Sequence, residues 1–344
     1  MRVVVVGGSG NVGTAVIERL RQAPEVTEIV GVSRRPPNTG GGPYAGLRWH
    51  AVDVGAPEAV ERLTPAFAGA DAVILLAWLL QPNRDEATMW RTNVTGTRHV
   101  LDAAAAAGVT QVACASSVGA YSAAPKSIRV DETWPTGGVH TSHYAREKAA
   151  MERVLDAFEV RHPGVILTRL RPGLVMQAPA AEGIRRLFLG RWFPTGWITR
   201  VRVPIVPLPS TTIAQVVHAS DLADAFWRSL ERRAGGAFNI AAEPVVTPEL
   251  VASLLGGRHV PFRAGATRRL LWAAWKLRLV AMDPGWIDLA TNIPVLSTER
   301  ARRVLGWSPR VDARAALAEM LEAVSRHDSI DQSPPLARGG TSTP

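Results

Sequence analysis

A serine, a tyrosine and a lysine stand at spacings that suit acid–base chemistry in the middle of this 344-residue chain. Tyr144 and Lys148 are four residues apart in the order Tyr-Ala-Arg-Glu-Lys, so on a helix they lie on one face. A nearby ammonium group favours the phenolate and therefore lowers the pKa of a phenol. The hydroxyl of Ser117 is the group that would hold a carbonyl or alcohol oxygen against that phenol. These residues predict proton transfer in step with hydride transfer at a cofactor.

A second signal stands at the N-terminus, where a strand, a glycine turn and a helix follow one another. Residues 2–6 are a short run rich in β-branched side chains, and Gly7, Gly10 and Gly13 follow it with the spacing Gly-x-x-Gly-x-x-Gly. An apolar pattern with helical spacing begins at Val12. Backbone N–H groups at such a helix N-terminus bind a diphosphate, so the segment predicts a dinucleotide site. The spacing differs from the commoner Gly-x-Gly-x-x-Gly fingerprint.

Short β-branched runs alternate with longer helical patterns from residue 1 to about residue 178. The candidate strands are residues 2–6, 28–33, 48–52, 72–76, 111–116 and 165–170. This alternation predicts an α/β fold with a doubly wound parallel sheet of the Rossmann type, which binds ligands at the carboxyl ends of its strands.

Both spacings together resemble the short-chain dehydrogenase/reductase superfamily, specifically its extended branch, the NAD-dependent epimerase/dehydratase family. The resemblance runs through most of the chain. The further segments that carry it are Asp53-Val54, Leu75-Leu76-Ala77, Asn93-Val94-Thr95-Gly96-Thr97 and residues 115–121, 217–223, 238–241 and 302–309. It implies a Rossmann-type nucleotide domain with a smaller C-terminal lobe that binds the substrate.

The resemblance also implies roles for individual residues. Tyr144 is the implied acid–base, Lys148 lowers its pKa and binds the nicotinamide ribose, and Ser117 orients the substrate oxygen. Strand alternation lets only one of Ser116 and Ser117 serve, and the spacing of four residues to Tyr121 matches the family for Ser117. The implied cofactor-binding residues are Gly7, Gly10, Asn11, Val12, Gly13, Arg34, Asp53, Val54, Leu76, Ala77, Asn93, Tyr144 and Lys148. No metal site is expected.

The phosphate state of the cofactor is read just after the second strand. Relatives that prefer NAD usually end that strand with an acid that binds the ribose 2′-hydroxyl. Here the sequence is Ser33-Arg34-Arg35-Pro36, without an acid. An arginine at this place attracts a 2′-phosphate, so NADP is favoured and NAD stays open.

The substrate is read from two departures from the family pattern. Sugar-nucleotide enzymes commonly carry Arg-Pro-x-Asn-Val-Tyr-Gly-Pro after the sixth strand, but here Leu174 replaces the Asn, and Met176 and Gln177 replace Tyr and Gly. These replacements argue against a nucleotide sugar as the substrate and predict a more apolar pocket. Val118-Gly119 stands where dehydratases place Asp-Glu, which speaks against elimination. Tryptophans are candidates to line a site for a bulky substrate or to pack the lobe, among them Trp192, Trp197, Trp272 and Trp275.

The leading prediction is an NAD(P)-dependent oxidoreductase that transfers a hydride to or from a ketone or secondary alcohol. One alternative is a nucleotide-sugar epimerase that retains its NAD. The other is a non-catalytic dinucleotide-binding sensor, a class that the Ser–Tyr–Lys set argues against.

Composition shifts along the chain predict its organisation. Residues 1–178 are assigned to the NAD(P)-binding domain, with residues 213–241 returning to it, and residues 179–327 mainly to the substrate lobe. Residues 328–344 are rich in Ser, Pro, Gly and Thr and predict a disordered tail. Residues 270–280 form an apolar helical stretch with basic residues, for which a packed helix over the lobe is favoured over a membrane surface.

Composition also excludes several classes of function. The formal net charge is +9, but the arginines are scattered and no basic block interleaved with aromatics occurs, which argues against nucleic acid. No run reaches the roughly 18 to 20 apolar residues of a membrane span. The first strand begins at once, which leaves no room for a signal peptide. We expect a cytoplasmic enzyme acting on a small-molecule carbonyl or alcohol, with a homodimer left open.

Overall fold

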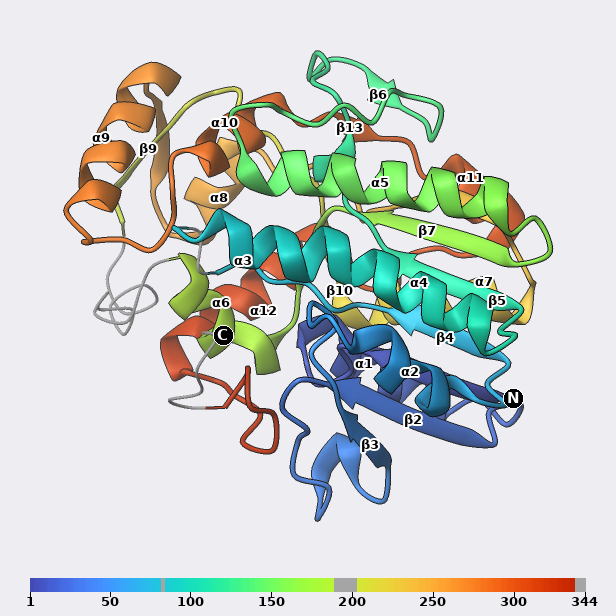
Figure 1. The fold of residues 1–344 in the computed structure, drawn as a ribbon. Helices are drawn as coiled ribbons and strands as arrows, with labels where there is room; N and C mark the ends of the chain where they lie inside the picture. The colour runs from blue at the N-terminus through green and yellow to red at the C-terminus, as the bar shows by residue number, and fades with distance from the viewer. Residues whose placement is uncertain (82–83, 189–202, 338–344) are drawn as a thin grey trace.

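Seven parallel strands form the central sheet of the computed structural model, which describes residues 1–81, 84–188 and 203–337 (Figure 1). Their order is β11-β7-β5-β4-β1-β2-β3. The strands are β1 (Arg2–Val6), β2 (Glu28–Ser33), β3 (Arg48–Ala51), β4 (Ala72–Leu75), β5 (Gln111–Ala115), β7 (Ile166–Pro172) and β11 (Gly236–Ile240). The predicted doubly wound Rossmann-type sheet is confirmed, and each predicted strand lies within two residues of the observed one.

Helices cover both faces of this sheet because its strands are apolar on both sides. Along β1, Val3 and Val5 pack into one core with α1 and α7, whereas Val4 and Val6 pack into a second core with α2, α4 and α5. The bounds are α1 (Asn11–Arg21), α2 (Ala59–Phe67), α4 (Gly96–Ala106), α5 (His143–Arg161) and α7 (Ala219–Glu231). Figure 1 shows α2, α4 and α5 side by side across one face.

The remaining elements flank the carboxyl end of the sheet or follow it in the chain. The short helices near the sheet are η1 (Gly42–Tyr44), α3 (Glu86–Trp90), the π-helix η2 (Arg91–Thr95), η3 (Val118–Ala120) and η4 (Ala178–Ala180). The later helices are α6 (Ala181–Phe188), α8 (Pro248–Leu254), α9 (Ala264–Lys276), α10 (Gly285–Asn292), α11 (Glu299–Leu305) and α12 (Ala313–Arg326). Three two-stranded parallel pairs join β8 (Leu174–Met176) to β10 (Val216–His218), β9 (Ile205–Leu208) to β12 (Arg258–Pro261), and β6 (Arg129–Val130) to β13 (Val295–Leu296).

The chain crosses between its two parts more than once. After the 203–210 region it re-enters the nucleotide-binding part with α7, which packs beside α1, and with β11, which pairs with β7. An ion pair joins Arg19 of α1 to Asp224 of α7, with 2.8 Å between Nε and Oδ1. Residues far apart in sequence therefore complete one core, while the domain boundaries given above stay a prediction.

The C-terminal segment packs against the N-terminal glycine turn. Ser333 is fully buried, and its hydroxyl donates a hydrogen bond of 2.6 Å to the carbonyl of Ser9. Leu336 is buried as well. The prediction of a disordered tail is therefore wrong for residues 328–337, because a few side chains anchor a segment whose composition is typical of disorder. The rest of that prediction, residues 338–344, lies outside the described residues.

Helix α9 packs on α10 on one side, as a packed helix would, and exposes its other side. None of its thirteen residues is buried. Among the described residues, no helix combines the length and apolar character that crossing a bilayer requires.

Candidate active site

Helix α5 presents the candidate acid–base at its N-terminus. Ser142 is the N-cap, and its hydroxyl accepts a hydrogen bond from the N–H of Ala145 at 3.4 Å. This cap starts the helix one residue before Tyr144, so that Tyr144 and Lys148 occupy successive turns. The tyrosine ring packs on Gly119, where an added Cβ would lie 2.8 Å from Cε1 of the ring. A glycine is therefore required there for the ring to reach its place.

The two serines after β5 have separate partners. The hydroxyl of Ser117 caps η3 by accepting the N–H of Gly119 at 3.0 Å, and it lies beside Tyr144, because a Cβ added at Gly119 would meet both the tyrosine ring and Oγ of Ser117 at 3.4 Å. The hydroxyl of Ser116 instead donates to the buried carboxylate of Glu152 at 2.5 Å. The structure thus brings Ser117, and not Ser116, to the tyrosine.

The electrostatics of Tyr144 differ from the expectation drawn from the sequence. Burial of the hydroxyl raises the pKa of Tyr144 to about 12, although the neighbouring hydroxyl of Ser117 lowers it and the carboxylate of Glu147 raises it further. The lowering of this pKa by Lys148 does not occur. Burial lowers the pKa of Lys148 itself to about 7, so its amine is only partly protonated at neutral pH and stabilises a phenolate less than a full ammonium charge would.

Two tryptophans that the sequence analysis did not single out flank the tyrosine. The ring of Trp78 lies 6.0 Å from that of Tyr144, edge-on, and the ring of Trp286 lies 5.1 Å from it. Lys148 Nζ lies 3.4 Å from the centre of the Trp78 ring and donates a hydrogen bond of 2.8 Å to the carbonyl of Ala115. The signal for Trp78 was its place directly after Leu76-Ala77; nothing local marked Trp286.

The tryptophans named from the sequence that the structure describes lie away from Tyr144. Trp272 and Trp275 belong to α9, and Trp192 and Trp197 lie outside the described residues. None of them is seen beside Tyr144 in the part of the chain that the structure describes.

The glycine turn is built so that space is left at the start of α1. Gly7 has a φ of +84°, and an added Cβ would lie 2.6 Å from the backbone nitrogen of Ala77. A Cβ on Gly13 would lie 2.4 Å from the carbonyl oxygen of Gly7. At Gly10, the N-cap of α1, the nearest atom would be that same oxygen at 3.4 Å. Gly7 and Gly13 are needed for the fold, whereas a side chain on Gly10 would fill the cradle itself.

The N-terminus of α1 suits a diphosphate on electrostatic grounds as well. No side chain caps it, and its first turn carries no acid. The helix dipole and the first N–H groups therefore face the cradle without a protein carboxylate in competition. Asn11 lies at its edge, where its carbonyl accepts Gln177 Nε2 at 2.7 Å, and Val12 packs on the core below. The residues present fit a dinucleotide.

The next two strands end beside this turn. At the end of β2 the hydroxyl of Ser33 is buried with no partner among the described residues. Arg34 and Arg35 follow, and the pKa of Arg35 is lowered by burial and by the charge of Arg34. After β3, the carboxylate of Asp53 accepts the N–H of Gly55 at 2.9 Å.

Two further predicted cofactor segments lie at the ends of these strands. Val54 packs against Gly96, where an added Cβ would lie 2.7 Å from its Cγ2. Leu76 and Ala77 follow β4 and line the turn at Gly7. The predicted cofactor residues of the first four strands therefore gather at one edge of the sheet.

Asn93 is the predicted cofactor residue with a different role. Its amide nitrogen donates to the carbonyl of Leu79 at 2.9 Å and to Oε2 of Glu147 at 2.6 Å, and its oxygen accepts the N–H of Leu79 at 2.7 Å. Both of its N–H donors are thus engaged, and the side chain is fully buried. Asn93 positions the segment after β4 and the catalytic helix instead of facing the cradle.

A buried network of charged and polar side chains holds this edge of the sheet together. Glu152 is fully buried and accepts hydrogen bonds from Arg169 at 3.1 Å and from Arg171 at 2.8 Å. Arg171 also donates to the hydroxyl of Tyr121 at 2.9 Å, and that hydroxyl donates to Asn239 Oδ1 at 2.7 Å. Burial alone would raise the pKa of Glu152, but the arginines and Ser116 lower it overall. This network joins α5 to the ends of β7 and β11.

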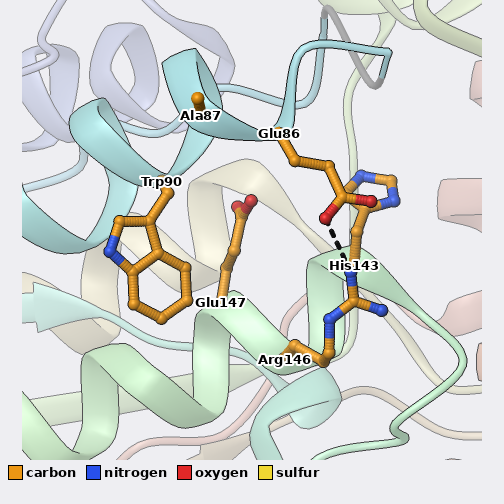
Figure 2. A pocket seen from close by; sticks show the side chains of 6 residues that line it. All are labelled: Glu86, Ala87, Trp90, His143, Arg146 and Glu147. Carbon is orange, nitrogen blue, oxygen red and sulfur yellow. Dashed lines mark hydrogen bonds and ion pairs between the residues drawn. The ribbon is translucent and has the colours of Figure 1, made fainter.

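A cavity of about 300 Å³ lies on the flank of α5, next to the site (Figure 2). Its lining residues are Glu86, Ala87, Trp90, His143, Arg146 and Glu147. Arg146 Nη2 and Glu86 Oε2 are 2.9 Å apart across it. None of Ser117, Tyr144 and Lys148 lines this cavity, so it is a neighbour of the candidate active site and not its substrate pocket.

Comparison with known proteins agrees with this geometry. The model of the NAD dependent epimerase/dehydratase family matches residues 3–241. The UDP-glucose 4-epimerase of Streptomyces lividans is 24% identical over 345 residues, which cover 95% of this chain and 96% of that protein. The L-arabinose 1-dehydrogenase (NAD(P)(+)) of Haloferax volcanii is 35% identical over 118 residues, which cover 34% of this chain and 41% of that protein.

Solved structures share the fold. The Thermus thermophilus UDP-glucose 4-epimerase in complex with NAD is 23% identical, with a TM-score of 0.68 over 95% of this chain and 99% of that one. The Thermotoga maritima UDP-glucose 4-epimerase with UDP-glucose is 20% identical, with a TM-score of 0.69 over the same shares.

Proposed function

This chain belongs to the NAD dependent epimerase/dehydratase family, and we propose that it is an NAD(P)-dependent oxidoreductase acting on a small carbonyl compound or secondary alcohol. The observation that carries the proposal is that the hydroxyl of Ser117 and the ring of Tyr144 both lie against Gly119 at the carboxyl end of β5, with Lys148 one helical turn from the tyrosine. A bound nicotinamide supplies the hydride chemistry. The chain supplies the proton and the hold on the substrate oxygen.

Tyr144 is the proton donor of the proposed reaction. With a pKa of about 12 its phenol is protonated at neutral pH and is ready to donate to a carbonyl oxygen. Part of the tyrosine remains accessible, so a substrate can reach it. The hydroxyl of Ser117 holds the same oxygen and stabilises the negative charge that develops there. The raised pKa supports reduction of a carbonyl as the favoured direction.

The end of β2 supports NADP as the cofactor. The hydroxyl of Ser33 is buried with no hydrogen-bond partner among the described residues, and the positive charges of Arg34 and Arg35 follow it directly in the chain, so the end of β2 suits an anion. No acid stands there to accept a ribose 2′-hydroxyl, as NAD recognition usually requires. A 2′-phosphate matches this chemistry better than a hydroxyl does.

The surroundings of Tyr144 support a bulky, largely apolar substrate. Trp78 and Trp286 form aromatic walls on two sides of the phenol. The indole N–H of Trp78 is buried with no partner among the described residues, so the site offers one unused donor to a ligand. Leu174 is 41% exposed at the position where the family's sugar-nucleotide enzymes carry a polar Asn.

A nucleotide-sugar epimerase is the second candidate. It is supported by the similarity to the Streptomyces lividans UDP-glucose 4-epimerase, which extends over nearly the whole of both chains. An epimerase keeps its cofactor through two half-reactions, whereas a reductase exchanges it in every cycle. Retention of the dinucleotide therefore separates the two candidates.

The deciding experiment has two arms. Mass spectrometry of ligand released from the purified protein by heat measures cofactor retention, and a depletion screen with NADPH and NADH over bulky ketones and aldehydes measures turnover. We expect little retained dinucleotide and consumption of NADPH with a carbonyl compound. Tightly retained NAD without depletion on any carbonyl would support the epimerase instead. Dinucleotide binding with no turnover in either arm would support the non-catalytic sensor.

A further inference from the structure

The outward side of α9 exposes large apolar side chains to solvent. Leu270 is 64% exposed and Trp272 is 49% exposed. Leu277, the C-cap of the helix, and Leu279, just beyond it, are each 70% exposed. Leu270 and Leu277 are seven residues apart, about two helical turns, so they lie on one side, whereas Trp272 lies about 200° around the helix from Leu270, with Arg269 and Lys276 between them. These four residues are called the α9 apolar face below.

The orientation of α9 is held by contacts on its opposite side. The guanidinium of Arg84 lies 4.0 Å from the centre of the Trp275 ring. The side chain of Arg268 is bonded to the carboxylate of Asp288 on α10 at 3.0 Å. Leu271, on the inward side, is only partly exposed. The α9 apolar face is therefore presented outward by a helix that is anchored to the rest of the molecule.

The stretch of sequence that carries this face has charges of one sign. Residues 250–282 contain no Asp or Glu. The basic residues of that stretch are Arg258, Arg263, Arg268, Arg269, Lys276 and Arg278. Arg269 and Lys276 are exposed and stand next to Leu270 and Leu277 along the helix. Basic side chains interleaved with Trp and Leu on the same exposed side are typical of a helix that lies at the surface of an anionic bilayer.

The helix is too short to cross a bilayer. Thirteen residues at about 1.5 Å each span about 20 Å, less than the roughly 30 Å of the hydrocarbon core. Figure 1 shows α9 at the outer edge of the molecule, far from β2 and β3 and from the start of α1. Contact at this edge leaves the dinucleotide cradle clear.

We propose that the α9 apolar face docks on an anionic lipid surface, with Leu270, Trp272, Leu277 and Leu279 entering the interface. Arg269 and Lys276 then reach the lipid phosphates while their stems cover the apolar surface. The positive charge of residues 250–282 selects a lipid surface over another apolar partner, because Asp and Glu are missing from the stretch that carries the face.

The test uses the full chain and vesicles of two compositions. Co-sedimentation with phosphatidylcholine vesicles and with phosphatidylcholine–phosphatidylglycerol vesicles is measured at rising salt. We expect binding to the anionic vesicles alone, weakened by salt. The double variant Leu277→Asp with Leu279→Asp should lower the partition coefficient at least about tenfold. The matched control is Val160→Asp, an apolar residue of α5 that is 83% exposed, and it should bind as the wild type does.

A charge pair completes the design. Arg269→Glu should weaken vesicle binding, whereas Arg153→Glu, an exposed arginine on α5, should have a smaller effect. Circular dichroism and NADPH titration establish that each variant is folded. Three results would overturn the proposal: no binding to either vesicle, anionic binding that the Leu277 and Leu279 substitutions leave unchanged, or concentration-dependent self-association that these substitutions abolish, which would make a second copy the occupant.

Discussion

Replacing Gly10 tests the cofactor site while sparing the fold. Gly10 has φ of −81° and ψ of −177°, a backbone conformation that any L-residue adopts. An added Cβ would have its nearest neighbour at 3.4 Å, an ordinary contact, whereas at Gly13 the nearest atom would be at 2.4 Å. Gly and Ala at a helix N-cap differ by less than about 1 kcal/mol. We therefore expect Gly10→Ala and Gly10→Val to fold and Gly13→Ala to be strongly destabilised.

The effect on dinucleotide binding should be much larger than the effect on stability. A side chain on Gly10 stands in front of the first N–H groups of α1, where the diphosphate would bind. A hydrogen bond to a charged group contributes about 1.5 to 3 kcal/mol, and the valine displaces the diphosphate from at least one such bond. A loss of about 3 kcal/mol corresponds to binding about 100-fold weaker. Gly10→Ala should give an intermediate loss.

Fluorescence titration with NADPH and NADH measures the binding, and thermal denaturation measures the stability. Gly164→Val is the matched control, because Gly164 lies in a turn after α5 and an added Cβ there meets nothing within 4 Å. Folded Gly10→Val that binds NADPH as tightly as the wild type would refute the site. Tighter binding of NADH than of NADPH by the wild type would refute the assignment of Arg34 to a 2′-phosphate.

Three further predictions concern groups that the structure shows to be buried. Glu152→Gln leaves Arg171 without its buried counter-charge and should lower the free energy of unfolding, measured by urea denaturation, by about 3 to 5 kcal/mol. The matched control is Glu159→Gln, which removes a 41% exposed partner of Arg169 and should cost less than about 1 kcal/mol. Because the pKa of Glu152 is lowered on folding, this contribution is present above the unfolded pKa of about 4.3 and is lost as the pH falls through the lower folded pKa. Burial lowers the pKa of Lys148 to about 7, so between pH 7 and about 10.4 the unfolded chain binds one more proton than the folded chain does. The stability of the wild type relative to Lys148→Met should therefore rise with pH across that window. A stability difference that stays constant with pH would contradict the burial of the Lys148 amine. Ser333→Ala removes the hydrogen bond to the Ser9 carbonyl, so it should lower the free energy of unfolding by about 1 to 3 kcal/mol and weaken NADPH binding. If neither the stability nor the NADPH affinity changes, the C-terminal segment does not support the glycine turn.

Local sequence was sufficient to predict the sheet and the positions of the three candidate catalytic residues. The β-branched run before Gly7 pairs on both sides in the centre of the sheet, where continuous apolar strands are expected. Tyr144 and Lys148 lie one turn apart on α5 because Ser142 starts the helix just before them. The choice of Ser117 over Ser116 followed from its spacing to Tyr121, and the structure agrees with it, because Ser116 donates to Glu152 whereas Ser117 lies against Gly119 beside the tyrosine ring.

Tertiary contacts decided what the sequence could not predict. The direction of the pKa shift of Tyr144 depends on how deeply its hydroxyl and the Lys148 amine are buried, which spacing along a helix does not reveal. Trp286 reaches the tyrosine from α10, far along the chain. The anchoring of the C-terminal segment rests on Ser333, a residue whose type alone is typical of disorder.

The most direct test of the proposed mechanism is the substitution Tyr144→Phe, assayed by NADPH consumption with the carbonyl compound found in the depletion screen. The phenolic oxygen gives the proton, whereas the ring that packs on Gly119 and between the two tryptophans is retained. We expect turnover to fall by at least about 100-fold, the scale of general acid catalysis, while NADPH binding stays within about twofold of the wild type. Near wild-type turnover by Tyr144→Phe would contradict the assignment of Tyr144 as the proton donor.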